Sequence, residues 1–168
     1  MKISEFFESP NGDIYSVSLS SEDGGLISNE IRKDIEKEGI IVLDVELNRI
    51  AGTNPTSTAI LLKATEMLAK AFLSQPNIII CYYCDFLSLL PYVNKRRKNM
   101  TVQEYRHILF SHMFDRFVSH HNLENVNLAV LTVEGSVENY YIHVIARNEH
   151  INYISYINNS IQKDFGKP

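Results

Sequence analysis

The chain has 168 residues, 45% of them hydrophobic, with a formal net charge of −4 and an isoelectric point near 5.8. This length and composition predict one domain over residues 1–168, and the acidic balance argues against a general nucleic-acid coat, which carries a large basic excess. Residues 1–5 contain no apolar leader, and no apolar run approaches the ~20 residues that cross a bilayer. Two cysteines are too few for a disulfide framework. We therefore expect a cytoplasmic protein without a membrane contact.

The first residues predict a β-hairpin. Asn11-Gly12 separates the apolar runs 3–7 and 14–19, and both turn residues tolerate the positive φ of a tight turn. A short charged helix is expected next, because Ser28 is a good N-cap residue and Gly39 supplies a left-handed stop.

The segment from Ile41 to Asn48 alternates between apolar and polar residues. Its apolar residues share one side, and Val42, Asp44 and Glu46 share the other, which predicts a half-exposed strand. Seven apolar residues between Ile60 and Phe72 then recur with the helical period and predict a long helix.

Residues 77–85 predict a central strand. The run is apolar at successive positions, so both of its faces must be covered, and it ends in the carboxylate of Asp85. The Thr101 to Glu104 capping box then starts a second long helix that ends near His120.

The last third of the chain predicts two strands and a helix. The strands, 126–133 and 140–146, flank a turn at residues 134–136. The final helix carries an apolar stripe from Ile151 to Phe165 and stops at Gly166. The element order ββ(α)βαβαββα predicts an α+β (α/β-like) fold with a single mixed or mostly antiparallel sheet of about six strands and helices packed on it.

The strand end Tyr82 to Asp85, the basic segment Lys95 to Lys98 and an aromatic helix with Phe110, Phe114 and Phe117 together resemble an uncharacterised group of small Bacteroidetes proteins, known only as a domain of unknown function. The resemblance runs from the first hairpin to the last helix. It implies a bacterial intracellular origin and brings no established catalytic residues.

The end of the central strand is the predicted ligand-binding edge. Ligands of open α/β sheets sit beyond the carboxyl ends of strands, and Asp85 is followed there by Lys95, Arg96, Arg97 and Lys98. Guanidinium groups suit bidentate contacts with phosphate or carboxylate. The alternative is that Asp85 caps a turn or pairs with a cation while the four basic residues are solvated.

Cys81 and Cys84 with His107 and His112 superficially match a zinc-ligand pattern. Cysteines three apart in a strand point to opposite faces, and histidines five apart on a helix diverge, so buried cysteines that act as small hydrophobes are the favoured reading. A thioredoxin-like role is disfavoured because neither cysteine starts a helix. We therefore expect no metal site and no cofactor.

His107, Ser111 and Asp115 lie four residues apart and superficially resemble a catalytic triad. Side chains stacked along one helix run parallel and do not converge on a substrate, so the polar side of an amphipathic helix is the simpler interpretation. His120 and His121 are expected to complement the negative end of the helix dipole. No catalytic residue is predicted.

These observations favour a non-enzymatic protein that acts by binding a protein partner, in the manner of an immunity, antitoxin-like or defence-associated protein. A phosphate-ligand or nucleic-acid binding module or an enzyme at the Asp85 edge is the alternative, with Tyr92 and Tyr105 near the basic run as stacking residues. A homodimer is a further prediction, in which tyrosines near the C-terminus contribute to the contact or to the core: Tyr140, Tyr141, Tyr153 and Tyr156.

Overall fold

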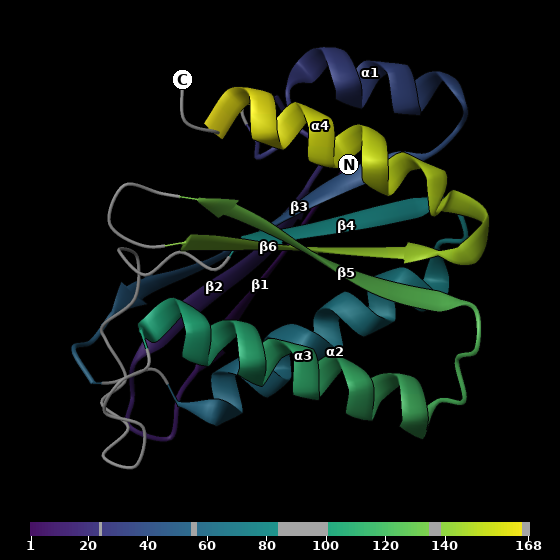
Figure 1. The fold of residues 1–168 in the computed structure, drawn as a ribbon. Coiled ribbons are helices and arrows are strands. Elements are labelled where there is room, and N and C mark those ends of the chain that lie inside the picture. Colours follow the sequence, from purple (N-terminus) through teal and green to yellow (C-terminus); the bar gives the residue numbers. More distant parts are fainter. Residues whose placement is uncertain (24, 55–56, 84–100, 135–138, 166–168) are drawn as a thin grey trace.

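The computed structural model describes residues 1–23, 25–54, 57–83, 101–134 and 139–165. Within these ranges one six-stranded sheet lies between two layers of helices (Figure 1). Its order is β1-β2-β3-β4-β6-β5; β3 and β4 are parallel and the other neighbours are antiparallel. The predicted fold class and element order are confirmed. The strands are β1 (Lys2–Glu8), β2 (Ile14–Ser20), β3 (Ile41–Ala51), β4 (Ile78–Tyr83), β5 (Val126–Glu134) and β6 (Asn139–Arg147).

Two pairs of helices cover the sheet. Helices α1 (Asn29–Lys37) and α4 (Asn152–Phe165) lie on one face, and α2 (Thr58–Ser74) and α3 (Val102–His120) lie on the other (Figure 1). The 3-10 helix η1 (Asn148–His150) leads into α4. No helix within the described ranges combines the length and hydropathy of a bilayer-spanning segment.

The predicted element boundaries are set by local signals that the structure confirms. Ser28 accepts a hydrogen bond from the backbone N–H of Ile31, and Gly39 ends the first helical segment with φ +77°. Thr101 and Glu104 form the reciprocal capping box of α3. These contacts satisfy backbone groups that helix ends otherwise leave without partners.

Helix α2 is fixed at its C-terminal end by a contact that the sequence did not predict. The Arg147 guanidinium donates hydrogen bonds to the carbonyl oxygens of Phe72, Gln75 and Pro76, at 2.5 to 2.9 Å. An arginine at this position also complements the negative end of the helix dipole. Strand β6 therefore fixes the position of α2 against the sheet.

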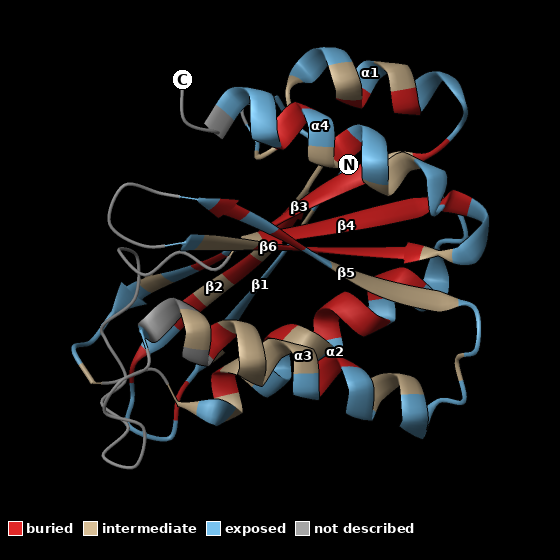
Figure 2. Cartoon of the chain, viewed as in Figure 1, coloured by how far each residue is buried: buried red, intermediate tan, exposed pale blue. Residues whose placement is uncertain are grey.

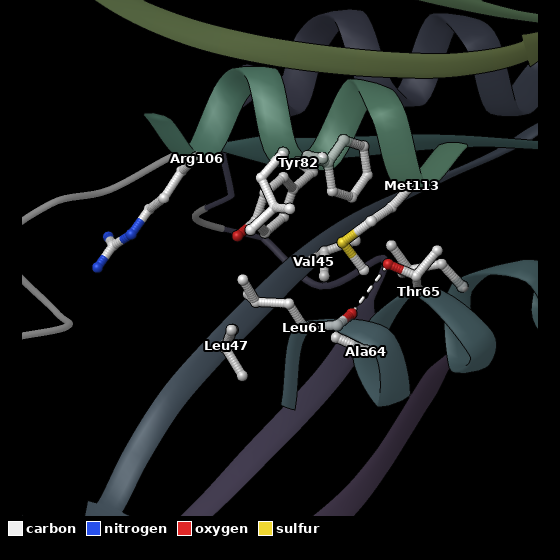
Figure 3. A pocket seen from close by; sticks show the side chains of 11 residues that line it. Val45, Leu47, Leu61, Ala64, Thr65, Tyr82, Arg106 and Met113 are labelled. Carbon is white, nitrogen blue, oxygen red and sulfur yellow. Dashed lines mark hydrogen bonds between the residues drawn. The ribbon is translucent and has the colours of Figure 1, made fainter. Parts of the chain in front are cut away.

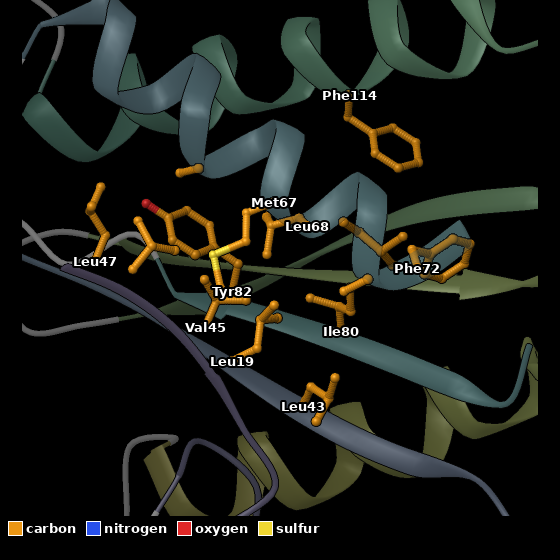
Figure 4. Packing of buried hydrophobic residues seen from close by; sticks show 14 of the residues in the cluster. Leu19, Leu43, Val45, Leu47, Met67, Leu68, Phe72, Ile80, Tyr82 and Phe114 are labelled. Carbon is orange, nitrogen blue, oxygen red and sulfur yellow. The ribbon is translucent and has the colours of Figure 1, made fainter. Parts of the chain in front are cut away.

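The core consists of two apolar clusters, one on each face of the sheet. On one face Leu43, Ile80 and Tyr82 pack against Met67, Leu68 and Phe72 of α2 (Figure 4). On the other face β4 and β6 pack against α1 and α4. Strand β4 is buried almost along its whole length (Figure 2), which confirms the prediction of a strand covered on both sides.

Two predictions of exposure are wrong. The first half of β3 is not half-exposed, because α1 covers its second face and buries both Val42 and Asp44. Ile151 is 46% exposed and lies in the turn before α4, outside the buried stripe formed by Ile157 and Ile161. Gly166, the predicted helix stop, lies outside the described residues.

Candidate functional site

The predicted binding edge is described only in part. Strand β4 ends at Tyr83, and Asp85, Lys95, Arg96, Arg97 and Lys98 fall in the range 84–100, outside the described residues. The anion-binding edge and its nucleic-acid variant therefore stay predictions. What the structure does show at this end of the sheet is the set of side chains that surround Tyr82.

A cluster of five rings fills the space between the end of β4, the start of β6 and the first turns of α3. Tyr82 stacks on Phe110 with ring centroids 4.8 Å apart, and His107 stacks on Tyr141 at 4.6 Å. His143 joins the two stacks: its Nε2 lies 3.0 Å from Nδ1 of His107, and its ring lies 4.8 Å from that of Phe110. We call these residues the ring cluster.

Both histidines of the ring cluster are poor bases. Burial lowers the pKa of His143 to about 3, because a charged ring would lose its hydration and because charge on His107 would repel it. Burial also lowers the pKa of His107. One neutral ring can donate its N–H to the other, so the pair is satisfied without charge at neutral pH.

The environment of His107 differs from the one that the sequence predicted. It does not belong to an exposed polar side of α3, because its ring contacts Tyr141 and His143 of β6. Asp115 is exposed, and Ser111 is half-buried. The three residues therefore do not share one environment: His107 contacts the sheet, whereas Asp115 faces solvent. The sequence signal that was overlooked is His143, a polar residue inside the otherwise apolar strand β6.

The cavity beside the ring cluster is small. Val45, Leu61, Ala64, Met113 and Tyr82 line a space of about 20 Å³ between the sheet, α2 and α3 (Figure 3). Such a space has room for about one water-sized sphere. Arg106 is buried at its margin, and its guanidinium points away from the space (Figure 3). This is a gap in the packing, too small for a substrate.

A much larger concave surface lies between α2 and α3. It is an open groove of about 1140 Å³ lined by side chains of both helices. Ala69 and Met113 are buried in its floor, and Leu62 and Leu73 lie along it with 46% and 47% exposure. We call this surface the α2/α3 groove.

Charged side chains of both signs border the α2/α3 groove. Glu66 and Lys70 come from α2, and Asp115 and Arg116 come from α3. His120 and His121 lie at one end of the groove, where α3 ends, and their interaction with the helix dipole stays a prediction. An apolar floor with a charged border is the usual anatomy of a protein-binding surface.

A buried ion pair that no local sequence pattern indicates connects α1 with β3. The Arg32 guanidinium donates to Oδ2 of Asp44 and to the carbonyl oxygen of Val42, and both side chains are almost inaccessible. Desolvation raises the pKa of Asp44, and the charge of Arg32 partly opposes this. A Cβ on Gly25 would overlap the Asp44 carboxylate, so only glycine fits there. This pair positions α1.

A second buried carboxylate ties the hairpin turn to the loop after β3. Asp13 accepts hydrogen bonds from the backbone N–H and the side-chain amide of Asn54, at 2.9 and 2.8 Å, and lies 3.5 Å from Arg49. Gly52 has φ +100°, and a Cβ on it would lie 2.0 Å from Oδ1 of Asp13. The network fixes two loops at the carboxyl end of β3.

The structure describes one of the two cysteines, Cys81, and confirms that it is buried. Cys81 is fully buried on the α1/α4 face, and desolvation raises the pKa of its thiol far above the ordinary value. His107 lies on the other face, where it contacts His143, a neighbour of Tyr82. These two residues therefore do not share an ion. Cys84 lies outside the described residues, and no group of three metal-ligating side chains occurs in the described part of the chain.

Comparisons with protein-family models, with curated proteins and with solved structures gave no match. The resemblance to the Bacteroidetes group thus stays a prediction.

Proposed function

We propose that this protein acts by binding a protein partner, and that an amphipathic helix of the partner occupies the α2/α3 groove. One observation carries the proposal: Leu62 and Leu73 remain nearly half exposed along a groove between α2 and α3 that charged side chains of both signs border. Leu62 and Leu73 are eleven positions apart, or about 16 Å along α2. This length matches about three turns of a docked helix.

The chemistry of the groove defines the partner. Leu62 and Leu73 are large apolar side chains that remain nearly half exposed, so a partner that covers them gains apolar burial of about 25 cal/mol per Å². Glu66 and Lys70 border the floor on the α2 side. A helix with an apolar stripe between residues of both charge signs is complementary to this surface. The effector of an immunity or antitoxin pair, or a defence-associated protein, is the proposed partner class.

The solvent exposure of the groove favours a protein over a small molecule as its ligand. Small-molecule pockets typically enclose most of the ligand surface, whereas Leu62 and Leu73 of this groove remain nearly half exposed to solvent. An open surface of this kind gains affinity from many contacts spread over an extended partner.

The test is photo-crosslinking followed by a binding measurement. A photoreactive residue replaces Leu73 in the cells that make the protein, and a matched one replaces Ile151, which is equally exposed in the turn before α4. The protein captured only from position 73 is purified and titrated by calorimetry. We expect Leu62→Asp with Leu73→Asp to weaken binding about 30-fold or more, the effect of losing an interface hot spot. Ile151→Asp should bind normally.

Either of two results overturns the proposal: no protein is captured specifically from position 73, or the captured protein binds the double variant as tightly as the wild type. Thermal unfolding of the variants checks that the fold is retained, which is expected because both leucines are on the surface.

A further inference from the structure

The two edges of the sheet end in different ways. At the β5 edge, Gln162 of α4 donates a hydrogen bond to the carbonyl oxygen of Thr132, so a helix covers part of the strand. At the opposite edge, β1 pairs with β2 from Lys2 to Glu8, and among the described residues no strand pairs with its other side. That side presents backbone N–H and C=O groups for pairing.

Strand β1 carries charges at Lys2, Glu5 and Glu8 but lacks two other features that prevent an edge from pairing, proline and a β-bulge. It runs for seven residues without proline, and its register with β2 has no bulge. Phe6 is 70% exposed. It lies on the α1/α4 side of the sheet, but neither helix reaches β1, and its neighbour on β2 is the small residue Ser16. An apolar ring in this position is stabilised when a further strand covers it.

The sequence of β1 is complementary to itself. When the strand is placed antiparallel to a second copy, with the two-fold axis at Glu5, Lys2 lies opposite Glu8 of the second copy and Ile3 lies opposite its Phe7. The register keeps each residue on its own face of the sheet. We propose that β1 pairs in this register with β1 of a second copy, so that the two sheets form one continuous sheet.

The contacts in this register argue for a second copy of this chain as the occupant. Two opposite-charge pairs form, because Lys2 meets Glu8 at both ends of the seven-residue strand. Phe6 lies opposite Ser4 of the second copy and diagonal to its Phe6, within the reach of aromatic side chains. Ile3 and Phe7, which pack against the α2 side of the core, extend that core across the axis.

One contact opposes the dimer and makes the register testable. Glu5 meets Glu5 of the second copy at the axis, and like charges directly opposite are destabilising. The interface is also short, so we expect dissociation constants of about 1–100 μM, typical of contacts below the standard interface size. The dimer does not use the α2/α3 groove and is independent of the proposed function.

Sedimentation equilibrium over a concentration series tests the register. Glu5→Gln should tighten the dimer about 3- to 10-fold, because it removes the repulsion at the axis. Glu8→Lys should weaken it at least 10-fold, since two attractive pairs become repulsive, and Lys2→Glu with Glu8→Lys should restore it. Glu36→Lys, an exposed change on α1 with the same effect on net charge, is the matched control and should dimerise normally.

Amide hydrogen exchange supplies a second measurement. The β1 amides that point away from β2 should gain protection as the concentration rises, whereas the amides of β5 should not. The proposal is overturned if both wild type and Glu5→Gln stay monomeric at about 1 mM, well above the expected dissociation constant. It is also overturned if Glu8→Lys and Glu36→Lys dimerise equally, or if the double charge exchange fails to restore the dimer.

Discussion

The two halves of the sheet differ in how many of their faces are covered. Helices cover both faces of β4 and β6, where Ile79, Cys81 and Val144 are buried on one side and Ile80 and Ile145 on the other. The β1–β2 hairpin has helix α2 on one face only. Strand β2 therefore alternates buried apolar residues with half-buried serines: Ser16, Ser18 and Ser20.

This difference explains how polar side chains on the faces of the strands are accommodated. In the doubly covered half a polar side chain is cut off from water, so Asp44 requires Arg32 and His143 is paired with His107. In the singly covered half Ser18 remains in contact with solvent and needs no fixed partner. Changes to polar side chains on the strand faces should therefore be costly in the first half and nearly neutral in the second. Asp13 is buried in the hairpin turn, bonded to Asn54, and stands outside this contrast.

The largest effect is expected for Arg32→Leu. The change leaves the Asp44 carboxylate buried without its counter-charge, and breaking one side of a buried pair typically costs about 3–5 kcal/mol. Urea unfolding measures the loss. Lys37→Leu removes the exposed partner of Asp34 and should leave the midpoint unchanged. Equal midpoints for the two variants would contradict the distinction between buried and exposed pairs.

A second effect is expected where the hairpin turn meets the loop after β3. Gly52→Ala places a side chain at φ +100°, which costs about 1–2 kcal/mol. It also forces the new Cβ onto the buried Asp13 carboxylate, and such overpacking adds about 1–3 kcal/mol.

The matched control is Gly12→Ala, which has a similar φ of +83° but open space around the new Cβ. It should lose only the backbone contribution. If thermal unfolding shows equal losses for the two alanines, the Asp13 network is not as tightly packed as the structure indicates.

The features that the sequence predicted well are specified by neighbouring residues. Gly12, Ser28 with Gly39, and Thr101 with Glu104 each define a turn or a helix end through contacts within a few positions. Of the predicted turn pair Asn11-Gly12, Gly12 alone has a positive φ. The uninterrupted apolar run of β4 likewise required two covered faces. These signals were sufficient for the element order and the fold class.

The features that the sequence missed depend on residues distant in the chain. Asp44 occupies the polar side of an alternating segment, and only the position of Arg32 on the preceding helix makes that side buried. The α2/α3 groove requires the relative placement of two helices that are separated by β4. The Asp85 edge lies outside the described residues, so this part of the predicted site stays open to test.

The pH dependence of stability should reveal His143. Burial lowers the pKa of His143 to about 3 in the folded protein, whereas the unfolded ring titrates near 6.5. Between these values only the unfolded state binds the proton, so the contribution to stability is complete above pH 6.5 and is lost as the pH falls. The loss between pH 8 and pH 5 should be about 2 kcal/mol.

The control for this titration is His143→Gln, which keeps a polar side chain in the strand and removes the ionisable ring. Carboxylates affect both proteins alike, so the difference between their urea unfolding free energies isolates the histidine. That difference should change by about 2 kcal/mol over this pH range. Parallel profiles would show that position 143 is reached by water.

The smallest effect is expected for Ser18→Thr, in the singly covered half. Ser18 lies between Ser4 and Glu46 on the face without helices, where a β-branched residue fits the pleated surface and has space around it. We expect a gain of up to about 0.5 kcal/mol in unfolding free energy, with Ser18→Ala shifted in the opposite direction.

A loss above about 1 kcal/mol for the threonine would instead indicate a clash with a covering segment. The contrast between the two halves of the sheet would then not hold. Because the added methyl group projects from the face and not from the edge of the sheet, this result does not depend on whether β1 pairs with a second copy.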